Sequence, residues 1–178
     1  MKIKKVSQSA GIIAEIEQNL DSNSEVNAPS VKAVKKAIEK SCILVRPASS
    51  YTVKNEKQVN IILDNVANKN GDKFSLINNK VKVGNGVSKV KISAAVFLND
   101  LLGHGYVWLK VMKNNINVAS SINSKGTDSA PYSSACIPTF VMDVVEGDEI
   151  GLWVEQTEYS NTSIRSDLIE TYLFVEEL

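Results

Sequence analysis

The sequence predicts a mainly β protein, an antiparallel sandwich preceded by one or two short helices. From Cys42 onward, apolar and polar residues alternate with a period of two, as they do in strands with one buried face. The strands are short and are interrupted regularly by Asn, Gly and Asp, without the strand–helix–strand rhythm of a parallel sheet. We therefore expect a helical segment over residues 1–41 and a β domain over residues 42–178.

The first predicted helix is marked by apolar residues at heptad spacing. Val6, Ile13 and Leu20 are seven residues apart, with Ile12 and Ile16 beside them. This pattern is compatible with a short helix or with a weak coiled-coil seam. A polar stretch over residues 21–24 ends it.

A second helix is predicted from Asn27 to Lys40. Asn27 is a favourable N-cap, and Pro29 is tolerated in the first helical turn. An apolar stripe follows at spacings of three and four residues: Val31, Val34 and Ile38. A helix this short is marginal alone, so its stripe needs a partner. That partner is either the β domain of the same chain or copies of the helix around a symmetry axis.

Two asparagine pairs predict β-hairpins. Asn78-Asn79 and Asn114-Asn115 each lie between two alternating segments. Asparagine tolerates the positive φ that a tight hairpin turn requires. Between these hairpins, residues 89–96 alternate throughout and predict a longer strand.

The remaining β segments are predicted from the same alternation. Glu146-Gly147-Asp148 separates Phe140–Val145 from Ile150–Gln156 and predicts a third hairpin. Leu168–Glu176 predicts the last strand. The segment Ser120–Ser134, rich in Ser, Gly and Asp, predicts the longest loop.

Charge and hydropathy narrow the range of partners. Twenty Lys and Arg balance twenty Asp and Glu, so electrostatics gives no reason to expect nucleic acid or an anionic membrane. No apolar run approaches the length of a membrane span, so we do not expect the chain to insert into a membrane. The apolar stretch over residues 10–14 is ended by Glu15 and Glu17, so we expect no secretory signal.

Catalytic residue patterns are scarce. His104 is the single histidine, so a Ser-His-Asp triad or a histidine metal site would have to include it. It stands between Gly103 and Gly105, as turn residues often do. Cys42 and Cys136 lie in apolar sequence without neighbouring metal ligands, and their pairing stays open. We expect a protein that is not an enzyme and has neither a metal nor a cofactor.

Two parts of the sequence resemble known families. Residues 27–34 resemble a segment of tail and baseplate proteins of phages that infect Gram-positive bacteria, where it precedes a C-terminal host-facing domain. The ordered set Lys89–Val96, Gly105–Asn114, Asp143–Ile150 and Thr171–Glu176 resembles the jelly roll of the tumour necrosis factor and complement globular-head superfamily. The second resemblance implies a jelly-roll sandwich, a homotrimer, and recognition of a receptor or carbohydrate without catalysis.

The two resemblances together suggest a phage or prophage virion protein. Its N-terminal helices would attach it to other virion proteins or trimerise it, and its jelly roll would face the host surface. The alternative is a cellular trimeric, lectin-like protein of the same fold, on a spore surface or secreted. The absent signal favours the virion, although spore-coat proteins also need no signal.

A trimer interface is predicted from large side chains that oppose the core-facing positions of their strands. Along residues 106–112, successive side chains point to opposite sides of the strand, and both sides carry large apolar residues. The same holds for residues 150–154 and 172–175. A second apolar face would be costly on a monomer, and pairing it across a threefold axis would hide it. The predicted interface residues are Tyr106, Trp108, Met112, Trp153, Tyr172 and Phe174. The alternative is that the N-terminal helices cover this face within one chain.

A ligand site is predicted in two polar segments. Ser120–Ser134 and Glu158–Asp167 combine aromatic rings with short polar side chains, which suits stacking on a sugar while hydrogen-bonding its hydroxyls. The candidate residues are Asp128, Tyr132, Tyr159, Asn161 and Arg165. The expected ligand is a glycan on the host cell surface.

Overall fold

The computed structural model describes residues 40–53, 58–99, 105–125, 132–156, 162–166 and 171–178. The helical segment predicted over residues 1–41 lies, up to residue 39, outside these residues. His104 also lies outside them.

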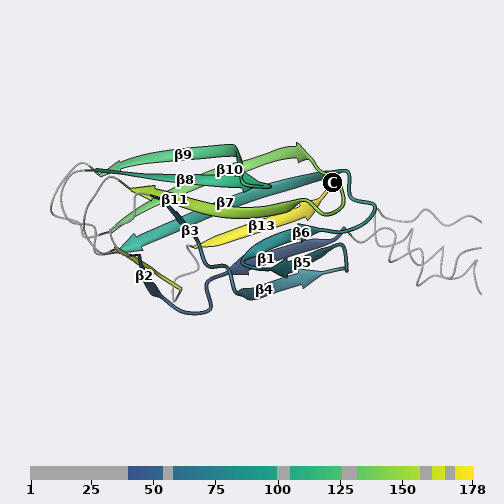
Figure 1. Cartoon of the computed structure of the whole chain (residues 1–178), viewed down its shortest axis with the longest axis horizontal. Coiled ribbons are helices and arrows are strands. Elements are labelled where there is room, and N and C mark those ends of the chain that lie inside the picture. The colour runs from purple at the N-terminus through teal and green to yellow at the C-terminus, as the bar shows by residue number, and fades with distance from the viewer. Residues whose placement is uncertain (1–39, 54–57, 100–104, 126–131, 157–161, 167–170) are drawn as a thin grey trace, which may run out of the picture. The chain divides into compact units, whose positions relative to one another are not determined.

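The described residues form thirteen strands and no helix, which confirms the mainly β prediction (Figure 1). The strands are β1 (Cys42–Arg46), β2 (Tyr51–Val53), β3 (Gln58–Asn60), β4 (Asn65–Asn70), β5 (Phe74–Ile77), β6 (Lys80–Val83), β7 (Lys89–Asn99), β8 (Gly105–Lys113), β9 (Ile116–Lys125), β10 (Tyr132–Asp143), β11 (Glu149–Gln156), β12 (Thr162–Ile164) and β13 (Tyr172–Glu177).

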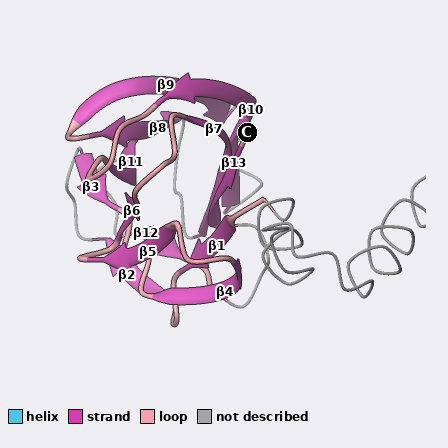
Figure 2. Cartoon of the chain, turned by 90° about the vertical axis from the view of Figure 1, so that its right-hand side faces the viewer, coloured by secondary structure: helices cyan, strands magenta, loops and turns pink. Residues whose placement is uncertain are grey.

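The strands make two sheets with antiparallel pairing throughout. The seven-stranded sheet has the order β2-β12-β7-β13-β1-β4, and β10 pairs with β7 beside this path. The six-stranded sheet has the order β5-β6-β11-β8-β9, and β3 pairs with β11. Figure 2 looks along the strands and shows the two sheets curving around a shared interior. The predicted antiparallel sandwich is therefore confirmed.

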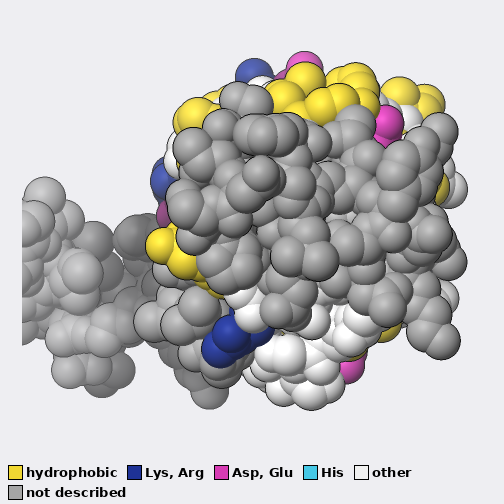
Figure 3. All heavy atoms as spheres, turned by 90° about the vertical axis from the view of Figure 1, so that its left-hand side faces the viewer, with side chains coloured by type: hydrophobic (Ala, Val, Ile, Leu, Met, Phe, Trp, Pro, Cys, Tyr) yellow, Lys and Arg dark blue, Asp and Glu magenta, His cyan; other side chains and the backbone are white. Residues whose placement is uncertain are grey.

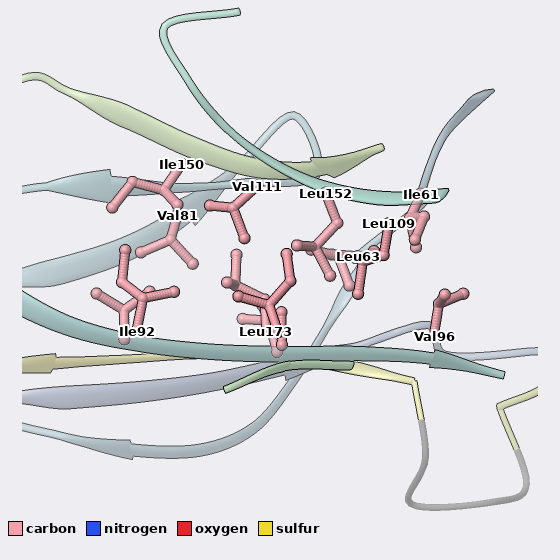
Figure 4. Packing of buried hydrophobic residues seen from close by; sticks show 14 of the residues in the cluster. Ile61, Leu63, Val81, Ile92, Val96, Leu109, Val111, Ile150, Leu152 and Leu173 are labelled. Carbon is pink, nitrogen blue, oxygen red and sulfur yellow. The ribbon is translucent and has the colours of Figure 1, made fainter. Parts of the chain in front are cut away.

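The core lies between the sheets and follows the alternation of the sequence. In β7, Val90, Ile92, Ala94 and Val96 are fully buried, whereas their sequence neighbours face outward. Figure 4 shows side chains of the six-stranded sheet, Val111, Ile150 and Leu152 among them, facing Ile92, Val96 and Leu173 of the other sheet. Burial of these side chains is the main force that holds the sheets together.

Both asparagine pairs form the predicted hairpin turns. Asn78 and Asn79 have φ angles of 50° and 63°, and Asn114 and Asn115 have 51° and 66°. They connect β5 to β6 and β8 to β9, which pair as hairpins. Positive φ at both central residues matches the right-handed twist of the flanking strands.

Asn79→Val is expected to lower the free energy of unfolding by about 1–2 kcal/mol, because a β-branched residue is strained at positive φ. Asn79→Gly should leave stability unchanged or slightly higher. Urea denaturation measures both, and Asn85→Val, at an exposed turn position outside the positive-φ set, is the control. An equal loss at positions 79 and 85 would contradict the role of the turn geometry.

The third predicted hairpin is wrong. The turn itself forms, with Gly147 at a φ of 90°, but it joins strands of different sheets. β10 pairs with β7, whereas β11 pairs with β3, β6 and β8. Local turn residues predict that the chain reverses, but they do not determine which strand the next segment will hydrogen-bond.

The predicted loop Ser120–Ser134 is largely strand. β9 continues to Lys125 in register with β8, and β10 already begins at Tyr132. Ser120 and Ser134, for example, are exposed residues of β9 and β10, and outer side chains of a strand need not be apolar, so the polar composition misled the prediction. The last strand is confirmed as Tyr172–Glu177, and residues 167–170 lie outside the described part of the chain.

Candidate binding surfaces

The outer face of the six-stranded sheet carries a compact cluster that we call the tryptophan platform: Trp108, Lys110, Trp153 and Glu155. Trp153 lies opposite Lys110, and Trp108 lies opposite Glu155, in the β8–β11 ladder. Their sequence neighbours on β8 and β11 are buried in the core, which places the platform on the outside. Adjacent strands thus assemble four side chains from two distant segments.

An ion pair and a cation–π contact hold the platform together. The Nζ atom of Lys110 is 2.6 Å from the Oε2 atom of Glu155 and 4.0 Å from the centre of the Trp108 ring. The Lys110 side chain is only 11% exposed, so the ammonium group is well shielded. The indole N–H groups of Trp108 and Trp153 are buried and have no hydrogen-bond partner among the described residues.

The outer face of the seven-stranded sheet carries a second cluster, which we call the aromatic face. It consists of the half-buried residues Leu44, Ala95, Phe97, Tyr172 and Phe174. The rings of Phe97 and Tyr132 stack with centroids 5.9 Å apart and planes inclined by 21°. The Lys91–Glu176 ion pair lies on the same face. The Nε atom of Arg46, on β1, is buried without a hydrogen-bond partner among the described residues.

A third surface is apolar, and we call it the β9–β10 edge. It lies where β9, the last strand of the six-stranded sheet, runs beside β10 of the seven-stranded sheet. Asn123 joins the two strands because its Nδ2 atom donates to the carbonyl oxygen of Ser134 at 2.6 Å. Figure 3 shows hydrophobic side chains gathered along the upper side of the molecule, where β9 lies in Figure 1. The edge exposes Ile116 (69%), Val118 (40%), Ile122 (59%), Tyr132 (55%) and Val141 (52%).

The six predicted interface residues do not share the single apolar face from which the interface was predicted. Tyr106, Trp108, Met112 and Trp153 belong to the six-stranded sheet, whereas Tyr172 and Phe174 belong to the seven-stranded sheet. The two groups therefore lie on different sheets of the sandwich, and Met112 is buried, with 7% of its surface exposed. The alternation predicts whether a side chain faces the core or the outside, but it does not predict which sheet contains the strand.

Of the five predicted ligand residues, the structure describes Tyr132 and Arg165 and brings both to one strand. β10 and β12 flank β7 on its two sides, so Tyr132 and Arg165 approach Phe97 from opposite directions. The Arg165 backbone N–H donates to the Phe97 carbonyl at 3.4 Å. Asp128, Tyr159 and Asn161 lie outside the described residues. Phe97 was not predicted from the sequence. Its place between the core residues Val96 and Leu98 of an alternating strand does mark it as outward-facing.

A buried carboxylate clamps the turns at one end of the sandwich. Asp148 is 4% exposed and accepts hydrogen bonds from the Val145 backbone N–H at 2.9 Å and the Asn114 amide at 2.7 Å. Lys113 pairs with it at 2.9 Å. Burial raises the pKa of Asp148, but the Val145, Lys113 and Asn114 donors outweigh this effect and hold the pKa below its ordinary value. This group ties the β8–β9 hairpin to the crossover between the sheets.

Both cysteines are free, Cys42 half-buried on β1 and Cys136 exposed on β10. Within the described ranges, no three His, Cys, Asp or Glu side chains come together as a metal-binding group. The same part of the chain contains no helix long and apolar enough to cross a membrane.

The architecture defines an antiparallel jelly-roll sandwich of the tumour necrosis factor type, and solved structures show the likeness. Murine APRIL at pH 5.0 aligns with a TM-score of 0.60 at 14% identity, over 79% of this chain and all of that chain. Murine APRIL at pH 8.0 gives 0.59 at 13% identity with the same coverage. Eiger TNF from S. frugiperda gives 0.59 at 11% identity, over 78% of this chain and 92% of that chain. No protein-family model matches the sequence, and no curated protein is found to be similar. The resemblance of the β domain to this jelly roll is confirmed at the level of the fold.

Proposed function

We propose that the protein is a homotrimeric binding module without catalytic activity. The observation that carries the proposal is the presence of two different apolar surfaces, the β9–β10 edge and the aromatic face, on one small sandwich. Exposed apolar patches of this kind mark interaction sites on soluble proteins.

The β9–β10 edge is costly to leave in water. Full burial of an exposed aliphatic side chain contributes about 1.5–3 kcal/mol, and the partly exposed side chains of this edge would each gain a share of that amount. Among the described strands, β9 pairs only with β8, and β10 only with β7, so both strands retain unpaired backbone groups along the edge. A surface of another copy that covers this edge would remove its apolar side chains from water and shield the unpaired backbone groups.

The aromatic face is the matching surface for this edge. It is broad, formed by adjacent strands, and rich in rings that pack well against aliphatic side chains. Contact between two different surfaces of identical chains is head-to-tail, and it closes into a ring when the rotation permits. The tumour necrosis factor type of fold supports three copies in that ring.

We further propose that this module acts in a phage virion, at the tail or baseplate, and recognises a glycan or receptor on the host cell. The resemblance of residues 27–34 to phage tail proteins supports this placement. The N-terminal segment would then connect the module to other virion proteins. Tryptic mass spectrometry of purified phage particles should detect the chain, and its absence from particles would refute the virion role.

The assembly is tested with one substitution on the β9–β10 edge. Purified wild-type protein should have the mass of three chains in light scattering at micromolar concentration. Val141→Asp should yield a folded monomer, because a carboxylate cannot be buried in an apolar contact without a partner. Ile77→Asp is the matched control, since Ile77 is 42% exposed but lies on β5, away from the edge. A monomeric wild-type protein would overturn the proposal.

A further inference from the structure

We infer that the tryptophan platform is a binding site for a neutral saccharide. The inference rests on the proposed function, since it names a ligand class and a location for the binding module. It assigns recognition to a sheet face that contains none of the five ligand residues predicted from the sequence.

The strand register places side chains of β3 and β9 beside the platform. Four strands lie side by side in the order β3, β11, β8 and β9 and present two rows of outward side chains. The rows are Asn60, Trp153, Lys110 and Ser120, followed by Gln58, Glu155, Trp108 and Ile122. The aromatic rings occupy the middle strands, and exposed amides and a hydroxyl lie on the outer strands. The sheet therefore carries an aromatic centre whose rim is polar at Asn60, Gln58 and Ser120, whereas Ile122 belongs to the β9–β10 edge.

The charge of the site selects a neutral ligand. Lys110 and Glu155 are the only charged residues of the two rows, and they neutralise each other in a contact of 2.6 Å. An anion would meet the Glu155 carboxylate without a free cation, and a cation would meet Lys110 over the Trp108 ring. Neither an anionic nor a cationic ligand is therefore favoured at this site.

The side chains match the two kinds of surface that a sugar ring presents. Its C–H face packs on an indole ring, and its hydroxyls exchange hydrogen bonds with groups such as Asn60, Gln58 and Ser120. The buried indole N–H groups have no partner among the described residues, so neither tryptophan is held there by a structural hydrogen bond. Lys110, which is paired with Glu155, lies over one face of the Trp108 ring and limits its movement, which lowers the entropy lost when a ligand binds.

The test uses the platform itself as the reporter. Trp108 and Trp153 are the only two tryptophans of the chain, so indole emission comes from this site alone. Full-length protein is titrated with cellohexaose, maltohexaose and chitohexaose, and with polygalacturonate as a charged comparison. We expect a saturable emission change with at least one neutral oligosaccharide and none with polygalacturonate.

Variants then locate the binding. Trp153→Ala should weaken the affinity for that oligosaccharide at least about tenfold, and Trp153→Phe, which keeps an aromatic ring, should weaken it less. Asn60→Ala, at an exposed rim position that does not risk folding, should weaken it several-fold. Val66→Ala, at an exposed position on β4 of the seven-stranded sheet and outside every surface described above, is the control and should bind like wild type.

Three outcomes of these titrations overturn the inference: no neutral oligosaccharide gives saturation, polygalacturonate binds in their place, or Trp153→Ala and Asn60→Ala bind like wild type. A trimer that adheres to host cells equally well with Trp153→Ala would also overturn it and would leave the proposed function intact. A monomeric protein that still shows the expected titration would support the saccharide site and refute the proposed trimer.

Discussion

Leu173→Ala is expected to lower the free energy of unfolding of one subunit by about 3 kcal/mol. Leu173 is fully buried on β13, which lies between β7 and β1 in the seven-stranded sheet. The substitution removes apolar contacts and leaves a cavity that a sheet paired on both sides cannot close by moving. Figure 4 shows the Leu173 side chain directed into the interior between the sheets.

The neighbouring residue provides the control. Tyr172 faces the opposite side of β13, on the aromatic face, and is only half-buried. Tyr172→Ala should therefore cost a subunit less stability than Leu173→Ala but should weaken assembly. Urea denaturation is best carried out in the Val141→Asp background, where subunit dissociation does not contribute to the measured stability. Equal losses at positions 172 and 173 would contradict the assignment of the two faces.

Asp148→Ala is expected to destabilise the fold by about 2–3 kcal/mol, because it leaves the Asn114, Val145 and Lys113 donors without their shared acceptor. Asp143→Ala is the matched control. The Asp143 carboxylate is 86% exposed and lies 3.5 Å from Lys89, so its ion pair contributes little in water. We expect a loss of less than about 0.5 kcal/mol at position 143. A comparable loss at both positions would show that Asp148 does not clamp the turns.

The same carboxylate gives the fold a defined sensitivity to acid. The pKa of Asp148 is lower in the folded state than its ordinary value of 3.8. Its contribution to stability is therefore present above that value and is lost as the pH falls through the lower folded-state pKa. Urea denaturation between pH 7 and pH 2 should show this loss in the wild-type protein. Asp148→Ala should lack that component, and an unchanged pH profile in the variant would exclude the linkage.

The sequence by itself determined which side of a strand is buried. Covalent geometry places successive side chains on opposite faces, so alternation at residues 89–96 and 106–111 is sufficient to predict the core positions of β7 and β8. Likewise, Asn78-Asn79 and Asn114-Asn115 predict their turns, because asparagine adopts positive φ at little cost. These predictions depend on interactions within a few residues of one another.

Only the tertiary structure decided which strands are neighbours. Gly147 turns the chain as its sequence predicts, yet the two strands that it connects belong to different sheets. Trp108 and Trp153 share one sheet face because β8 and β11 pair, whereas Tyr172 lies on the other sheet because β13 pairs with β1 and β7. The neighbours of a strand are fixed by how all the strands together bury their apolar faces and pair their backbone groups. That condition involves residues far apart in the chain, so no local pattern contains it.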